Sequence, residues 1–178
     1  LFRSIGLVRD IVHNLGHPVR GRRVLLLGAG GATRGALLPL LAQQPARVFV
    51  ANRTVDKATS LVQEFLARGA PPSLEGGGYA DLRPADCFDV VINATSASLG
   101  QELPAVPPTA FAPHALAYDM VYGKGLTPFL TLARQAGAPH LADGVGMLVE
   151  QAAEAFVWWR GVRPDTTPMI ERLRVPLN

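Results

Sequence analysis

The chain has 178 residues, of which 48% are hydrophobic and 17% charged, and its formal net charge is only +3. These values fit one well-packed globular domain, and the absence of a dense basic block argues against a nucleic-acid-binding protein. Cys87 is the only cysteine, which excludes a disulfide framework and a cysteine-based zinc site and favours a reducing, cytoplasmic setting. No apolar run approaches the ~18 residues of a membrane span and no signal-peptide pattern is present, so we expect no membrane partner.

The spacing of apolar residues predicts helices and strands in alternation along the chain. In chain order the expected elements are a helix at 4–15, a strand at 24–27, a helix at 32–43, a strand at 48–51, a helix at 55–68, a loop at 71–78, a short strand at 79–82, a strand at 89–92, a loop at 97–113, a strand at 115–120, a helix at 128–135, a short strand at 140–141, and helices at 147–160 and 168–174. Such alternation predicts an α/β protein with a doubly wound parallel sheet between two helical layers, a three-layer αβα arrangement. Sheets of this kind bind ligands beyond the carboxyl ends of their strands.

A glycine-rich turn directly follows the first expected strand. The run Gly28-Ala29-Gly30-Gly31-Ala32-Thr33 approximates the dinucleotide-binding fingerprint of a Rossmann fold, with Thr33 in place of the third glycine. The glycines allow a tight turn and the close approach of a pyrophosphate, and the N-terminus of the following helix offers unpaired N–H groups. The alternative is an ordinary strand-to-helix turn, but the strand before it and the helix after it favour a pyrophosphate site.

A basic triplet, Asn52-Arg53-Thr54, follows the second expected strand. In NAD-binding folds this place usually carries Asp or Glu, which accepts hydrogen bonds from the ribose hydroxyls. Arg53 can instead pair with a 2′-phosphate and stack on adenine, and Lys57, one helical turn later, adds positive charge. The alternative is a solvated surface arginine, but the position of the triplet relative to the glycine turn favours NADP over NAD as the cofactor.

Several motifs, taken in order along the chain, resemble shikimate dehydrogenase. They are the run 28–34, the triplet 52–54, Asn93-Ala94-Thr95-Ser96, Tyr118-Asp119-Met120-Val121-Tyr122, the segment 143–152 and the phrase at 159–165. The resemblance runs from about Ile5 to Leu173 and covers the NADP-binding domain of the family, which carries an additional N-terminal substrate domain. It therefore implies that residues 1–178 form one NADP-binding Rossmann domain.

The resemblance also implies roles for individual residues. The pyrophosphate is expected to bind at Gly28, Ala29, Gly30, Gly31 and Ala32, and the 2′-phosphate and adenine at Asn52, Arg53, Thr54 and Lys57. Thr95 and Ser96 are expected to line the cofactor channel, and Met120 and Gly144 to contact the nicotinamide end. Substrate contacts are expected from Tyr122 and Gln151. Three of these residues also have a structural interpretation. Met120 could be a core residue at a strand end, Tyr122 an aromatic residue on the surface, and Gln151 a polar residue on the solvated side of a helix. The four histidines lack metal-ligand spacing, so we expect no metal site.

The activity that the resemblance implies is the reduction of 3-dehydroshikimate to shikimate by NADPH, a step of aromatic amino acid biosynthesis. The carbonyl oxygen must gain a proton as it gains the hydride, and the family uses a lysine and an aspartate for this. The lysine belongs to the substrate domain, neither Lys57 nor Lys124 lies in a matching motif, and Arg3 stands where the aspartate is expected. Because arginine stays protonated, we expect the chain alone to bind NADP(H) but to lack catalytic residues and to be almost inactive.

The helices expected within 1–15 and 147–174 would pack toward the substrate domain of the family. The chain starts at Leu1 inside a helical pattern, which indicates a fragment, a processed chain or a cloned domain. Apolar surface left exposed on these helices favours a homodimer or a larger assembly. Two alternative functions stay open, a stand-alone NADP-binding module without catalysis and a quinate/shikimate dehydrogenase, whereas the segments 93–96 and 143–151 argue against a glutamyl-tRNA reductase.

Overall fold

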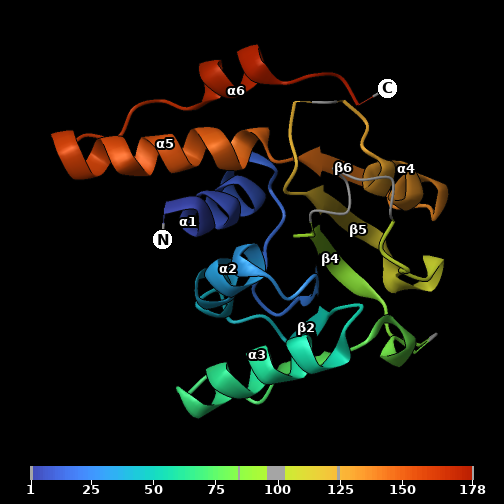
Figure 1. The fold of residues 1–178 in the computed structure, drawn as a ribbon. Coiled ribbons are helices and arrows are strands. Elements are labelled where there is room, and N and C mark those ends of the chain that lie inside the picture. The colour runs from blue at the N-terminus through green and yellow to red at the C-terminus, as the bar shows by residue number, and fades with distance from the viewer. Residues whose placement is uncertain (1, 84, 96–102, 124, 178) are drawn as a thin grey trace.

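The computed structural model describes residues 2–83, 85–95, 103–123 and 125–177. Its centre is a six-stranded parallel sheet with the strand order β3-β2-β1-β4-β5-β6 (Figure 1). The chain winds outward from β1 to β3 on one side and then from β4 to β6 on the other, so the sheet is doubly wound. The predicted α/β, Rossmann-type fold is confirmed.

The elements alternate as the apolar spacing predicts. The strands are β1 (Arg23–Leu27), β2 (Arg47–Ala51), β3 (Leu74–Gly77), β4 (Phe88–Asn93), β5 (Phe111–Asp119) and β6 (His140–Asp143). The α-helices are α1 (Phe2–Arg9), α2 (Gly31–Leu41), α3 (Val55–Ala67), α4 (Pro128–Gln135), α5 (Val145–Arg160) and α6 (Thr167–Leu173), and shorter helical turns are η1 (Asp10–Asn14), η2 (Tyr79–Asp81) and η4 (Pro108–Ala110). Within the described ranges, no helix combines the length and the apolar character needed to cross a membrane.

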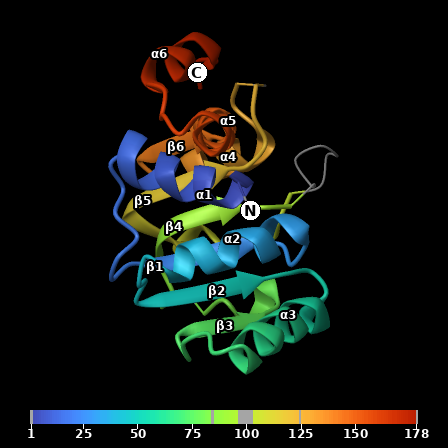
Figure 2. The same cartoon turned by 90° about the vertical axis from the view of Figure 1, so that its left-hand side faces the viewer.

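The two faces of the sheet bury separate hydrophobic clusters. Val24 and Leu26 of β1 belong to the cluster that α1, α2, α3 and α5 cover, whereas Leu25 and Leu27 belong to the cluster under α4. All four side chains are fully buried, which is why this strand is a continuous apolar run rather than an alternating one. Figure 2 shows α1 and α2 lying in front of the sheet.

The region 71–82 differs from the sequence-based prediction. The loop expected at 71–78 contains the edge strand β3, and the short strand expected at 79–82 is the 3₁₀ turn η2. A glycine at position 76 is required because α3 crosses close by: a Cβ there would lie 2.8 Å from Val62 Cγ2 and 2.9 Å from the carbonyl oxygen of Ala58. Three consecutive glycines predict a loop by propensity, but here the first two of them belong to a strand, and Gly76 packs closely under a helix.

Two further boundaries also differ. β5 begins at Phe111, inside the segment expected to be a loop, and residues 97–102 of that segment lie outside the described ranges. Pro113 is tolerated within β5 because the pairing with β4 shifts register between Phe88 and Val90, and proline is found in strands at such irregularities. The helix expected at 4–15 is α-helical only to Arg9 and continues as the π-helical turn η1.

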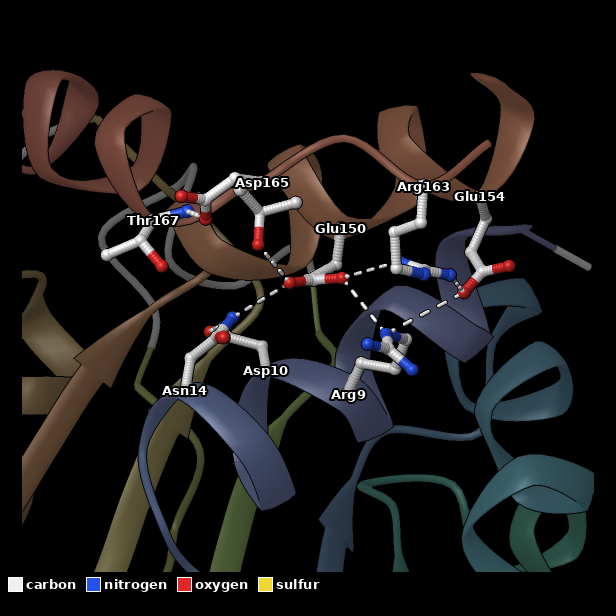
Figure 3. A network of polar contacts seen from close by, with 9 residues as sticks. Arg9, Asp10, Asn14, Glu150, Glu154, Arg163, Asp165 and Thr167 are labelled. Atoms are coloured by element: carbon white, nitrogen blue, oxygen red, sulfur yellow. Dashed lines mark hydrogen bonds and ion pairs between the residues drawn. The ribbon is translucent and has the colours of Figure 1, made fainter. Parts of the chain in front are cut away.

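A network of polar contacts joins α1 and η1 to α5 and to the segment after α5 (Figure 3). Its centre is Glu150, which is only 2% exposed. Its carboxylate accepts hydrogen bonds from Arg9 Nε at 3.1 Å, Asn14 Nδ2 at 3.2 Å, Arg163 Nη1 at 3.2 Å and the Thr166 hydroxyl at 2.6 Å. Burial acts to raise the pKa of Glu150, but the hydrogen bonds from Thr166, Asn14 and Arg9, with the charge of Arg9, together lower it.

Asp10, at the start of η1, is a second buried carboxylate on the same seam. It accepts hydrogen bonds from the Tyr118 hydroxyl at 2.7 Å and from Asn14 Nδ2 at 3.0 Å. Burial raises the pKa of Asp10, and the two hydrogen bonds oppose that rise only in part. The carboxylate fills the space beside Gly146 of α5, where a Cβ would overlap with it. We call the contact of α1 and η1 with α5, centred on Asp10 and Glu150, the α1–α5 seam.

Candidate functional site

A cleft of about 540 Å³ opens at the carboxyl ends of β1, β2 and β4. The register of the sheet explains its position, because Leu27 pairs with Ala51 on one side and with Asn93 on the other. The residues that follow these three strands therefore meet at one edge of the sheet. Ten of the residues predicted to bind the cofactor line this cleft, namely Gly28, Ala29, Gly30, Gly31, Ala32, Asn52, Arg53, Thr54, Lys57 and Thr95.

The glycine turn makes the floor of the cleft. Gly28 has a φ of +100°, and a Cβ at this position would lie 2.9 Å from Thr95 Cγ2, so both the backbone and the neighbour require glycine. The Gly28 N–H donates to the carbonyl of Ala51 at 2.7 Å, which continues the sheet into the turn. Thr33, which replaces the third glycine of the fingerprint, is buried and donates its hydroxyl to the carbonyl of Gly28 at 2.6 Å. The substitution therefore ties α2 to the turn.

The first turn of α2 faces the cleft. The helix begins at Gly31 with Gly30 as its N-cap, and a Cβ on either residue would meet nothing within 4 Å. The first N–H groups of a helix have no partners within the helix and carry the positive end of its dipole. An anion such as a pyrophosphate can approach this backbone without a steric obstacle.

Asn52 joins the glycine turn to the basic triplet. Its Oδ1 accepts a hydrogen bond from the backbone N–H of Ala29 at 3.3 Å, and its Nδ2 donates to the carbonyl of Thr54 at 2.8 Å. This side chain therefore fixes the spacing between the floor of the cleft and the N-terminus of α3. Arg53 and Lys57 line the same end, and no acidic residue is among the described residues that line the cleft. The charge at this end favours a phosphate over a bare ribose hydroxyl pair.

Thr95 is held on the β4 side of the cleft. Its backbone N–H and its hydroxyl both donate to Asn93 Oδ1, at 3.2 and 2.7 Å. Asn93 is fully buried and donates its Nδ2 to Asp119 Oδ1 at 3.1 Å, which links the ends of β4 and β5. Ser96, the neighbouring predicted residue, lies outside the described residues.

The four remaining predicted residues do not line the cleft. Met120 and Gly144 adjoin each other farther along the strand ends, since a Cβ on Gly144 would lie 2.6 Å from the carbonyl oxygen of Met120. Tyr122 follows β5 and is 44% exposed. Gln151 is on α5, at the point where α1 comes closest: a Cβ on Gly6 would lie 2.8 Å from its backbone nitrogen.

Four lining residues were not predicted from the sequence, namely Tyr79, Ala94, Leu103 and Pro104. Ala94 belongs to the family motif at 93–96, so its position in that motif could have predicted it as a lining residue. Leu103 and Pro104 belong to an irregular segment that no periodicity places near the cleft. Tyr79 was missed because residues 79–82 were predicted to form a strand. A residue within such a strand would not reach the cleft, whereas Tyr79, in the turn after β3, does.

Comparison with known proteins places this cleft in a family. A model described as Shikimate / quinate 5-dehydrogenase matches residues 10–100, and one described as the Shikimate 5'-dehydrogenase C-terminal domain matches residues 144–174. The chain belongs to the shikimate/quinate 5-dehydrogenase family. Both the glycine turn and the basic triplet lie within the first match, so the residues that build the cleft are among those that carry the family resemblance.

Relatives of this family align over nearly the whole chain. A shikimate dehydrogenase (NADP(+)) from Dechloromonas aromatica is 61% identical over 97% of this chain and 61% of its own length. The corresponding protein of Aromatoleum aromaticum is 57% identical over 97% of this chain and 62% of its own length. This chain thus spans about three fifths of the length of the curated relatives that it matches.

Solved structures share the fold of the family. The crystal structure of an Ael1 enzyme from Pseudomonas putida superposes with a TM-score of 0.92, at 56% identity over 99% of this chain and 64% of that one. The shikimate 5-dehydrogenase of Thermus thermophilus, solved in complex with NADP(H) and shikimate, gives a TM-score of 0.77 at 30% identity, over 97% of this chain and 61% of that one.

Proposed function

We propose that this chain is the NADP(H)-holding part of a shikimate dehydrogenase, the enzyme that reduces 3-dehydroshikimate to shikimate. The observation that carries this proposal is the cleft, which has a glycine floor and helix N-terminus at one end and Arg53 with Lys57 at the other. When bound in this cleft, NADPH would supply the hydride for the substrate carbonyl. The fit of the chain to this cofactor rests on Gly28, where a side chain would fill the cradle, and on the absence of an acid among the described lining residues.

Each part of the cleft then has a task. Residues 28–32 form the pyrophosphate site, where the first N–H groups of α2 are the donors, and Asn52, Arg53, Thr54 and Lys57 bind the 2′-phosphate and adenine. Thr95 and Ser96 border the path of the cofactor beyond β4. Met120 and Gly144, which adjoin each other at the ends of β5 and β6, are assigned to the nicotinamide end.

Tyr122 and Gln151 are proposed to contact the substrate. Both lie away from the adenosine end, Tyr122 after β5 and Gln151 on α5. The hydroxyl and amide groups of these side chains can donate and accept hydrogen bonds to the hydroxyl and carboxylate groups of shikimate. Binding titrations of the chain with shikimate and with quinate, both in the presence of NADP(+), will show which of the two these contacts favour.

We also propose that these 178 residues by themselves turn over shikimate very slowly. The family uses a lysine and an aspartate for proton transfer, and Lys57 lies in the cleft beside Arg53, at the adenosine end rather than near the reacting carbonyl. Arg3, in the place of the aspartate, stays protonated. Turnover of shikimate at a rate normal for an enzyme would contradict this part of the proposal, and it would also exclude a non-catalytic NADP-binding module.

An apolar surface at the far end of α5 is proposed to pack against another folded unit. Trp158 and Trp159 are 73% and 83% exposed, and Phe156 and Val162, which are close to them in sequence, are also exposed. Surfaces of this kind are seldom left in water. We expect a cytoplasmic protein whose α5–α6 end meets a substrate domain or a second copy of the chain. A monomer at all concentrations in light scattering would contradict self-association of the chain.

The test of the cofactor assignment is a fluorescence titration of the chain with NADPH and with NADH. We expect tighter binding of NADPH, because only NADPH carries the 2′-phosphate that Arg53 can pair with. Equal affinity for the two nucleotides would contradict the assignment of NADP.

A further inference from the structure

Tyr79 lies beside Arg53 because of the sheet register. Ala51 of β2 pairs with Gly77 of β3, and the Asn52 N–H donates to the Gly77 carbonyl at 3.0 Å. Arg53 comes two residues after Ala51, beyond the end of β2, and Tyr79 comes two residues after Gly77, at the start of η2. Both side chains line the cleft at its adenosine end.

The backbone around Tyr79 is firmly held. The Gly78 N–H donates to Asp81 Oδ2 at 2.7 Å, and the Leu82 N–H donates to the Tyr79 carbonyl at 3.3 Å, which closes the turn η2. The preceding Gly77 packs against the ring of Phe49, where a Cβ would lie 3.2 Å from Phe49 Cζ. Because the backbone is held on both sides of this turn, the Tyr79 side chain starts from one backbone position.

The ring of Tyr79 has two different environments. It packs against the hydrophobic cluster on the α4 face of the sheet, and it also borders the cleft. Burial raises the pKa of the Tyr79 hydroxyl, while the charge of Arg53 opposes that rise. The hydroxyl therefore stays protonated at neutral pH and can donate a hydrogen bond to an anion.

Two of the other uncharged side chains that line the cleft already donate hydrogen bonds within the protein. The Asn52 amide bonds to the carbonyl of Thr54, and the Thr95 hydroxyl bonds to Asn93. A phosphate that pairs with Arg53 would have the Tyr79 hydroxyl as an uncharged side-chain donor on the β3 side, in addition to the Thr54 hydroxyl before α3.

We propose that Tyr79 is a specificity-determining residue for the cofactor: its ring forms the wall for the adenosine, and its hydroxyl donates to the 2′-phosphate beside Arg53. This inference rests on the proposed function and adds a residue that the sequence motifs do not contain. The ring and the hydroxyl of Tyr79 should affect binding separately. The ring contacts any adenine nucleotide, whereas the hydroxyl donates a hydrogen bond only to a nucleotide that carries a 2′-phosphate.

The test compares Y79F and Y79L with the wild-type chain in titrations with NADPH and NADH. A hydrogen bond to a charged group is worth about tenfold in affinity, so Y79F should raise the Kd for NADPH about tenfold and leave that for NADH unchanged. Y79L should weaken binding of both nucleotides, because it removes the aromatic wall. The thermal unfolding midpoint of each variant shows whether the domain remains folded.

The matched control is R68Q, which removes a positive charge from the far end of α3, where Arg68 pairs with Glu64. It should leave both affinities unchanged. NADPH affinity of Y79F equal to that of the wild type would overturn the role of the hydroxyl, and NADH affinity of Y79L equal to the wild type would overturn the role of the ring. If instead the wild type itself fails to prefer NADPH, the proposed function fails and not merely the role of Tyr79.

Discussion

The cofactor cleft and the α1–α5 seam lie in the same small domain but use different chemistry. The cleft is lined by glycines, backbone N–H groups and two basic side chains, and no acid is among its described lining residues. The seam buries two carboxylates, Asp10 and Glu150, whose donors come from α1, η1, β5 and the segment after α5. The cleft presents the first N–H groups of α2 to a ligand, whereas the seam satisfies its polar groups internally. Changes in the cleft should therefore alter binding, and changes in the seam should alter stability.

The largest expected effect is that of G146A in the seam. A Cβ at this position would overlap with the buried carboxylate of Asp10, and the helices on both sides leave little room for adjustment. We expect a loss of about 3 kcal/mol in the free energy of unfolding, measured by urea denaturation. The control is G31A, at the first position of α2, where a Cβ would meet nothing within 4 Å, and it should change the free energy of unfolding by less than about 1 kcal/mol. Equal stability of G146A and the wild type would show that the seam is not closely packed.

Removing the charge of Glu150 should cost about 2 kcal/mol, because E150Q leaves the hydrogen-bond donors around it poorly matched. The pKa of Glu150 is lowered in the fold, so its stabilising effect is present above the unfolded pKa and is lost as pH falls through the folded pKa. The difference between the wild type and E150Q should therefore shrink in acid.

The matched control is E64Q, which removes an exposed carboxylate that pairs with Arg34 and Arg68. Exposed ion pairs contribute little, so its loss of stability should be clearly smaller than that of E150Q. The same loss for both variants would mean that burial adds nothing to the Glu150 network.

Asp10 should show the opposite dependence on pH. Burial raises its pKa, so the folded state favours the neutral carboxyl, and stability is lost as pH rises from the unfolded pKa through the folded pKa. The stability of D10N relative to the wild type should then improve as pH rises from about 4 to about 7, in contrast to that of E150Q. Urea denaturation at several pH values measures both trends, and parallel slopes for the two variants would refute the opposed shifts.

Local sequence patterns predict the cleft much better than the seam. The apolar run at 24–27 and the glycines after it specify a buried strand, a tight turn and a helix start, all of which are local features. Tyr79 escaped prediction because three glycines look like a loop until α3 packs against Gly76. The hydrogen bonds of Glu150 to Arg9 and Asn14 span 141 and 136 residues, so no local pattern could indicate them.

The most direct test of the central claim, that Arg53 selects a 2′-phosphate, is calorimetric titration of the wild type and R53Q with 2′,5′-ADP and with AMP. Loss of a charged hydrogen-bonding partner should weaken 2′,5′-ADP binding by about ten- to a hundredfold and leave AMP binding unchanged. Equal affinity of the wild type and R53Q for 2′,5′-ADP would contradict the account.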